Sequence, residues 1–135
     1  MGGVSSKKQK TEKPFKDYVN WFEIPAVNFQ QAVNFYNHIY AMDMEINQDE
    51  NYTMAFFPAT TGIGGAIVAG PGSTPSDTGP LLYLNGGKDL NTILQRVEKA
   101  GGRIVLPKTL INEDSGYFAI FIDSEGNKLA LHSKN

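Results

Sequence analysis

The sequence DSEGNKLALHS, residues 123–133, decides the fold. Residues 124–127 (SEGN) predict a turn, because glycine and small polar residues favour turns. Residues 128–132 (KLALH) predict a short apolar strand. Successive side chains of a strand face opposite sides, so Ala130 and His132 share one face while Leu129 and Leu131 share the other. The stretch is therefore interpreted as the closing strand of a sheet.

The same pattern occurs 61 residues earlier, where Gly65 corresponds to Gly126 and Ala69 to Ala130. The offset also relates two helical patterns, each with an N-cap candidate followed by apolar residues at i, i+3, i+4 and i+7. The matching pairs are Asn28/Asp89, Phe29/Leu90, Ala32/Ile93, Val33/Leu94 and Tyr36/Val97. A repeat at one offset indicates that the chain is one module written twice.

Each copy is predicted to have the order βαβββ. The first has a helix from Asn28 to about residue 40 and strands at 19–24, 43–47, 52–57 and 66–69. The second has a helix from Asp89 to the glycines at 101 and 102, and strands at 81–85, 103–106, 117–122 and 128–132. Residues 70–80 are rich in glycine and proline and predict a flexible linker, and residues 107–115 predict a polar excursion.

The predicted fold class is α+β. Each unit has one sheet with a helix on one side, so the twin unit is the natural cover for the other side. The sheets are expected to form a partly closed eight-stranded barrel with a central cleft. The expected division is a disordered basic tail (1–16), a first unit (17–70), a linker (71–79) and a second unit (80–135), making one domain overall.

Composition excludes several classes of protein. The chain has no cysteine, which excludes disulfides and thiolate zinc sites. Five lysines and one glutamate give residues 1–16 a net charge of +4, and the rest of the chain carries −6 of the total of −2. A nucleic-acid surface is therefore not expected. No apolar run approaches the roughly 18 residues of a membrane helix, so a cytoplasmic protein without membrane contact is expected. Residues 1–6 match the N-myristoylation pattern, but a plain solubilising tail is favoured.

Three segments together resemble the vicinal oxygen chelate superfamily, which contains glyoxalase I, bleomycin-resistance proteins and extradiol dioxygenases. They are NFQQAVNFY in the first helix, KAGGRIV after the second, and DSEGNKLALH at the end. The resemblance covers residues 18–133. It implies the glyoxalase-like fold, a homodimer and, in the enzymes of the group, a divalent metal held by His, Gln or Glu from the first and last strand of each unit.

The resemblance carries the metal-ligand positions onto Trp21, Ala69, Leu82 and Ala130 of this sequence. None of these side chains offers the oxygen or imidazole donors that hard divalent ions need. Neither a metal nor any other cofactor is therefore predicted. The metal-free members of the group, such as the bleomycin-binding proteins, use the same cleft for binding alone.

The expected cleft is an apolar pocket with one carboxylate and one imidazole, which is typical of small-molecule sites. Its predicted ligand-binding residues are Trp21, Glu23, Ile67, Ala69, Leu82, Leu84, Ala130 and His132. Apolar surroundings favour the protonated form of a carboxyl group, so Glu23, with His132, is the candidate for proton transfer.

Structural alternatives stand beside these roles. Trp21 is also compatible with a core position, Glu23 with an exposed or lysine-paired one, and His132 with the rim near the C-terminus. His38 lies off the apolar stripe of its helix and is expected to be exposed. Residues 62–65 (GIGG) lack the helix and the Lys-Ser/Thr of a phosphate loop, so a turn or cleft lip is expected.

Three functions remain open from the sequence. The first is a protein that binds a small apolar or aromatic molecule without metal. The second is a lyase, isomerase or dioxygenase-type enzyme that uses Glu23 and His132. The third is a structural or regulatory dimer whose cleft is filled by its own side chains.

Overall fold

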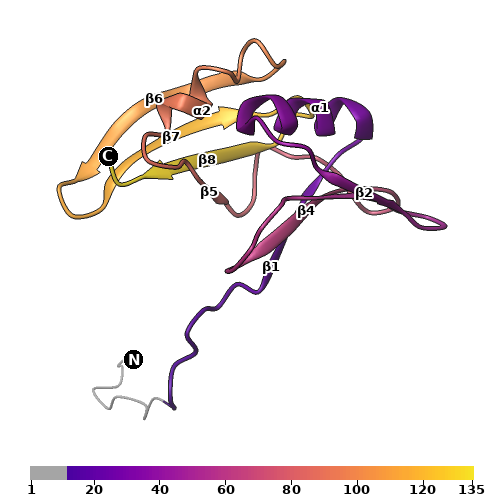
Figure 1. Cartoon of the computed structure of the whole chain (residues 1–135), viewed down its shortest axis with the longest axis horizontal. Coiled ribbons are helices and arrows are strands. Elements are labelled where there is room, and N and C mark those ends of the chain that lie inside the picture. Colours follow the sequence, from indigo (N-terminus) through magenta and orange to yellow (C-terminus); the bar gives the residue numbers. More distant parts are fainter. Residues whose placement is uncertain (1–11) are drawn as a thin grey trace, which may run out of the picture.

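The computed structural model describes residues 12–135, which form two four-stranded mixed sheets and two helices (Figure 1). The first unit contains β1 (Trp21–Pro25), α1 (Phe29–Tyr40), β2 (Glu45–Gln48), β3 (Thr53–Phe56) and β4 (Gly64–Ala69). The second contains β5 (Tyr83–Asn85), α2 (Asn91–Leu94), β6 (Arg103–Asn112), β7 (Gly116–Ile122) and β8 (Lys128–Ser133). The predicted order, βαβββ twice, is confirmed. The N-myristoylation pattern and most of the predicted basic tail lie outside the described residues.

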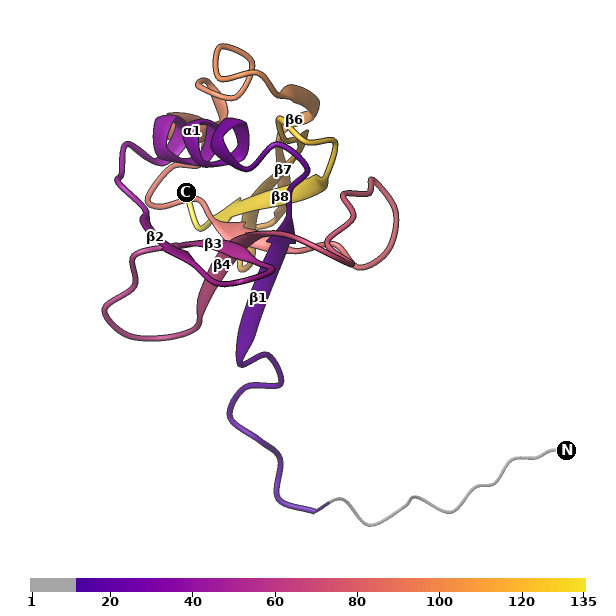
Figure 2. The ribbon, with the colours of Figure 1, turned by 90° about the vertical axis from the view of Figure 1, so that its right-hand side faces the viewer.

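Both sheets have the same topology. The strand orders are β1-β4-β3-β2 and β5-β8-β7-β6, and in each sheet the first strand runs parallel to the last while the other pairs are antiparallel. Strands β1 and β5 are edge strands and are not paired with each other. The eight strands therefore form two separate sheets, and a partly closed barrel stays a prediction. Figure 2 shows the residues before β1 running away from both sheets.

Three elements differ from the sequence prediction. Helix α2 is only four residues long, and the turns after it mix bonds over three and four residues up to Gly102. Its predicted stripe is nevertheless buried, because Leu90, Ile93, Leu94 and Val97 still face the core. Strand β6 continues through the predicted polar excursion with several register shifts. Strand β4 begins two residues earlier than predicted. Within residues 12–135, no helix is long and apolar enough to cross a membrane.

Helix α1 follows its sequence signals closely. The side chain of Asn28 caps it by accepting a hydrogen bond from the backbone N–H of Gln31 at 3.1 Å. The helix ends at Ala41, which adopts the left-handed conformation with φ of 52°. The buried side of the helix consists of Ala32, Val33, Phe35, Tyr36 and Ile39. This stripe directs α1 into the space between the two units.

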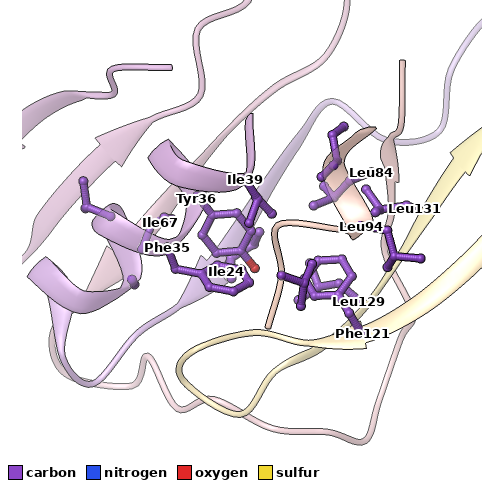
Figure 3. Close-up of a cluster of buried hydrophobic side chains, with 14 of the residues drawn as sticks. Ile24, Phe35, Tyr36, Ile39, Ile67, Leu84, Leu94, Phe121, Leu129 and Leu131 are labelled. Atoms are coloured by element: carbon purple, nitrogen blue, oxygen red, sulfur yellow. The ribbon is translucent and has the colours of Figure 1, made fainter. Parts of the chain in front are cut away.

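One hydrophobic core is shared by both units (Figure 3). The rings of Phe35 on α1 and Phe121 on β7 stack with their centroids 6.1 Å apart. Other contributions come from Ile24, Tyr36, Ile39 and Ile67 in the first unit and from Leu84, Leu94, Leu129 and Leu131 in the second. Because the units bury their apolar sides against each other, neither has a complete core alone.

A buried carboxylate lies at the junction of the units. Asp123 is 3% exposed, and the hydroxyl of Tyr36 donates to its Oδ2 at 2.7 Å. The backbone N–H groups of Glu125 and Asn127 each donate to Oδ1 at 2.9 Å, which closes the predicted turn. The Glu125 side chain then accepts from the backbone N–H groups of Val27 at 2.9 Å and Asn28 at 2.6 Å. The turn of the second unit therefore holds the start of α1 in the first.

Tyr36→Phe is predicted to lower the free energy of unfolding by about 1.5–3 kcal/mol at pH 7, the usual range for a hydrogen bond to a charged group. Burial first, and then the charge of Asp123, raises the pKa of Tyr36 well above its ordinary value. The folded state therefore keeps this proton above pH ~10, where the unfolded chain loses it. The wild type should lose stability relative to Tyr36→Phe by about 1.4 kcal/mol per pH unit there. Urea denaturation from pH 7 to 11 measures both effects, and parallel curves above pH 10 would contradict the assignment.

Candidate functional site

Each sheet has a helix side and an open side, and the register assigns residues to them. Ile24 is paired with Ile67 and Leu84 with Leu131, and all four are buried in the core beneath the helices. Paired residues share a face, so their neighbours along the strands face away from the helices. On the first sheet this open side carries Trp21, Glu23, Ala66 and Val68. On the second sheet it carries Tyr83, Asn85, Ala130 and His132.

The predicted grouping of the cleft residues is wrong in part. Ile67, Ala69, Leu82 and Leu84 lie on the helix side of their strands, whereas Trp21, Glu23, Ala130 and His132 lie on the open side. The single offset of 61 fails inside the strands: Ile24 and Leu84 are 60 residues apart. Their partners Ile67 and Leu131 are 64 apart. Since a slip of one residue exchanges the two faces, residues matched by the offset point to opposite sides.

Trp21 and Glu23 form one polar-aromatic pair on β1. The indole Nε1 of Trp21 donates to Glu23 Oε2 at 3.3 Å, and the Trp21 ring lies 6.2 Å from that of Phe56. The indole also covers Gly64, where an added Cβ would lie 3.2 Å from it. Trp21 is 44% exposed, so the alternative that it fills the core is wrong for the single chain. The side chain of Glu23 is exposed, as its alternative proposed, with Trp21 rather than a lysine as its partner.

His132 lies away from this pair. Its Nε2 lies 2.6 Å from the carbonyl oxygen of Ser115, and it is half-buried between the strand neighbours Asn85 and Phe118. It lines a hollow of about 500 Å³ with Tyr83, Leu84, Asn85 and Ile111. Glu23 lines two other hollows and not this one. His38 on α1 is exposed, as predicted.

The linker between the units is held at both ends, and we call residues 70–80 the strap. The hydroxyl of Tyr52 donates to the carbonyl oxygen of Pro71 at 2.9 Å. The backbone N–H of Ser76 donates to Asn127 Oδ1 at 3.0 Å. The Asn127 amide nitrogen in turn donates to the carbonyl oxygen of Pro25 at 2.8 Å and to Asp123 Oδ2 at 3.0 Å. The predicted flexible linker is therefore fastened to β1 and to the buried turn.

Two hollows lie beside the strap, and Glu23 lines both. The smaller is about 220 Å³ and contains residues of β1, the strap, and the start of β8. The larger is about 440 Å³ and adds Asn47, Asp49 and Tyr52 from the first unit, with the strap residues Pro71, Gly72 and Ser73. Sequence reasoning identified Glu23 but missed the strap, because a glycine- and proline-rich segment carries no signal for the surface it covers.

The largest hollow lies between the units, and we call it the inter-unit hollow. It has a volume of about 680 Å³, and no charged side chain lines it. The rings of Phe22 and Phe57, 5.3 Å apart, form part of the wall from the first unit, and Leu82, Leu84 and Asn85 contribute from the second. Phe22 fits closely because Gly65 has no side chain: a Cβ there would lie 2.3 Å from its ring.

Tyr40 links the two walls of the inter-unit hollow. Its hydroxyl donates to the carbonyl oxygen of Asn85 at 2.8 Å, across the boundary between the units. Burial raises the pKa of Tyr40 well above its ordinary value, so the hydroxyl stays neutral at physiological pH. Of the predicted ligand-binding residues, only Leu82 and Leu84 line this hollow. Sequence reasoning missed the aromatic residues, although the pair Phe56-Phe57 before Pro58 was visible.

The residues present do not fit the divalent metal that the resemblance implies. Within residues 12–135, no three His, Asp or Glu side chains cluster as a metal site would require. By the observed register, the equivalent positions on the open sides are Glu23 and Ala66 in the first unit and Tyr83 and Ala130 in the second. One carboxylate alone does not make a hard-cation site.

Solved structures share this fold. Glyoxalase I from Zea mays superposes with a TM-score of 0.64 and 19% identity over 84% of this chain and 43% of that chain. The glyoxalase family protein from Enterococcus faecalis gives 0.63 and 18% over 88% and 98%. A glyoxalase/bleomycin resistance protein/dioxygenase family enzyme from Burkholderia phytofirmans PsJN gives 0.62 and 13% over 86% and 98%.

These similarities establish the glyoxalase fold and confirm the resemblance to the vicinal oxygen chelate superfamily at the level of fold. The chain spans less than half the length of the maize glyoxalase I chains. No protein-family model and no curated protein matches the sequence. The fold therefore restricts the architecture, while the chemistry has to be inferred from the residues of this chain.

Asn127→Ala is predicted to lower the free energy of unfolding by about 1–3 kcal/mol, because it leaves the Pro25 carbonyl and the Ser76 N–H without partners. It should also release the strap and speed its cleavage by subtilisin. Exposed Asn91→Ala is the control and should change neither quantity. Stability and strap cleavage unchanged in Asn127→Ala would contradict the anchoring role.

Proposed function

We propose that this chain binds a small apolar or aromatic molecule in the inter-unit hollow, without a metal. The observation that carries the proposal is the hollow itself, about 680 Å³ in volume, with walls from both units and no charged side chain among them. Small-molecule sites are typically concave, mostly apolar and about 300–1,000 Å³ in volume. The hollow combines these features at one place in the fold.

The walls indicate how such a molecule is held. Phe22 and Phe57 lie with their ring planes inclined at 51°, so a flat ring can contact one face and one edge. Thr60 and Thr61 contribute hydroxyl groups at the wall, and their backbone is exposed. The Tyr40 hydroxyl is already engaged with Asn85, so it shapes the wall rather than offering a free donor. A ligand with one aromatic ring and at most one or two polar groups suits this arrangement.

The alternative functions receive less support. The enzyme hypothesis places proton transfer on Glu23 and His132, but these residues line different hollows and neither lines the inter-unit hollow. The hypothesis of a structural module requires a cleft filled by its own side chains. An open hollow of this size between the units argues against such filling. Binding is therefore the function that the geometry supports best.

Ala59→Phe is predicted to weaken binding of toluene and p-cresol at least tenfold. Ala59 lines the hollow but is exposed, so a larger side chain occupies the space with little effect on the core. Ligand-observed NMR titration measures the affinity. Exposed Thr92→Phe on α2 adds the same ring elsewhere and should bind like the wild type. Equal affinity of Ala59→Phe and the wild type would sink the proposal.

We further propose that the chain forms a homodimer, consistent with its exposed sheet edges and apolar side chains on β6. Val105, Leu110 and Ile111 are each between 44% and 53% exposed on this edge strand. Covering such an edge avoids uncontrolled strand pairing. Light scattering should give twice the chain mass of 14.8 kDa. The double variant Leu110→Lys/Ile111→Lys should give one chain mass, and a monomeric wild type would refute the dimer.

A further inference from the structure

The smaller hollow beside the strap carries two opposite charges. Glu23 reaches it from β1 and Lys128 from the start of β8, and both lie on the open sides of their sheets. The only ion pair within residues 12–135 joins Lys108 and Asp89, so Glu23 and Lys128 are not paired with each other. A carboxylate and an ammonium group therefore line one hollow from different sheets, too far apart to neutralise each other directly.

The rest of the hollow is suited to a small polar molecule. The strap contributes the hydroxyl-bearing residues Thr74, Ser76 and Thr78, and Leu82 gives the lining an apolar part. The volume of about 220 Å³ is below the usual range of drug-sized sites, so the ligand is correspondingly small. The anchor through Asn127 holds the Ser76 backbone in place beside the buried turn. The hollow is thus built from three segments that are tied together.

One oxygen of Glu23 is already oriented. Trp21 donates its indole N–H to Oε2, which leaves Oε1 as the acceptor available to a ligand in the hollow. A ligand ammonium would gain a charge-assisted hydrogen bond there. A ligand carboxylate would gain the same from the Lys128 ammonium. A molecule that carries only one of these charges satisfies one wall and leaves the other charge with solvent.

We propose that this hollow binds a small zwitterion of amino-acid size, with its ammonium group on Glu23 and its carboxylate on Lys128. The strap hydroxyls supply hydrogen bonds between the two ends. The site is separate from the inter-unit hollow, with which it shares only Leu82. It therefore stands or falls independently of the proposed binding of an apolar molecule.

Calorimetry with glycine, L-alanine, L-serine and β-alanine tests the proposal on the full chain. At least one of the four should bind saturably and shift the emission of Trp21, which is the only tryptophan and contacts Glu23. Ethylamine and propionate each keep one charge and should bind at least tenfold more weakly. Absence of saturable binding by all four zwitterions would overturn the proposal, as would equal binding by the one-charge analogues.

Two variants assign the ends of the ligand. Glu23→Gln should weaken the zwitterion at least tenfold and abolish its advantage over propionate, and Lys128→Met should abolish its advantage over ethylamine. Exposed Glu98→Gln and Lys99→Met are the matched controls and should bind like the wild type. If Glu23→Gln and Lys128→Met bind like these controls, the assignment is wrong. Binding of p-cresol should be the same in all four variants, which separates this site from the inter-unit hollow.

Discussion

The buried carboxylate of Asp123 is the constraint on which the arrangement of the two units depends. Removing a charge from water is costly unless hydrogen bonds replace the lost solvation. Here four donors do so: the Tyr36 hydroxyl, two backbone N–H groups of the turn, and the Asn127 amide. Tyr36 belongs to the first unit and the other donors to the second. The charge is therefore satisfied only when the units are docked, which links the local turn to the global fold.

The same turn also completes helix α1. The first turn of α1 contains no acidic residue of its own, although negative charge is favourable there. Glu125 supplies it from the other unit by accepting from the N–H groups of Val27 and Asn28, and the amide of Gln31 reaches back to the same side chain at 3.1 Å. Docking at this end brings β1 and β5 together as unpaired edges. The inter-unit hollow is the space they leave between Phe22 and Leu84.

Helix caps and apolar stripes were readable from the sequence because they depend on local spacing. The stripe containing Tyr36 is buried as predicted, and Asn28 caps its helix as predicted. The faces of the strands were not readable in the same way, since one offset assumed identical loop lengths in both units. Leu82 was expected beside Ala130 but faces the helices, and Tyr83 takes its place. Side-chain period two makes such an error complete: every residue of the strand changes face. The strap was missed for a different reason, because its position depends on distant partners such as Asn127.

The strap also explains why the two halves of a repeat can differ in function. A two-unit chain has one connection between its units, so a feature built from that connection has no twin. Glu23 lies beside the strap and lines two hollows. By register its equivalent in the second unit is Tyr83, which is 51% exposed and packs near Phe118, with ring centroids 6.3 Å apart. The repeat thus supplies two similar sheets, and the connection makes one of them polar and walled. Differences in chemistry between the halves follow from topology before any difference in the individual strands is considered.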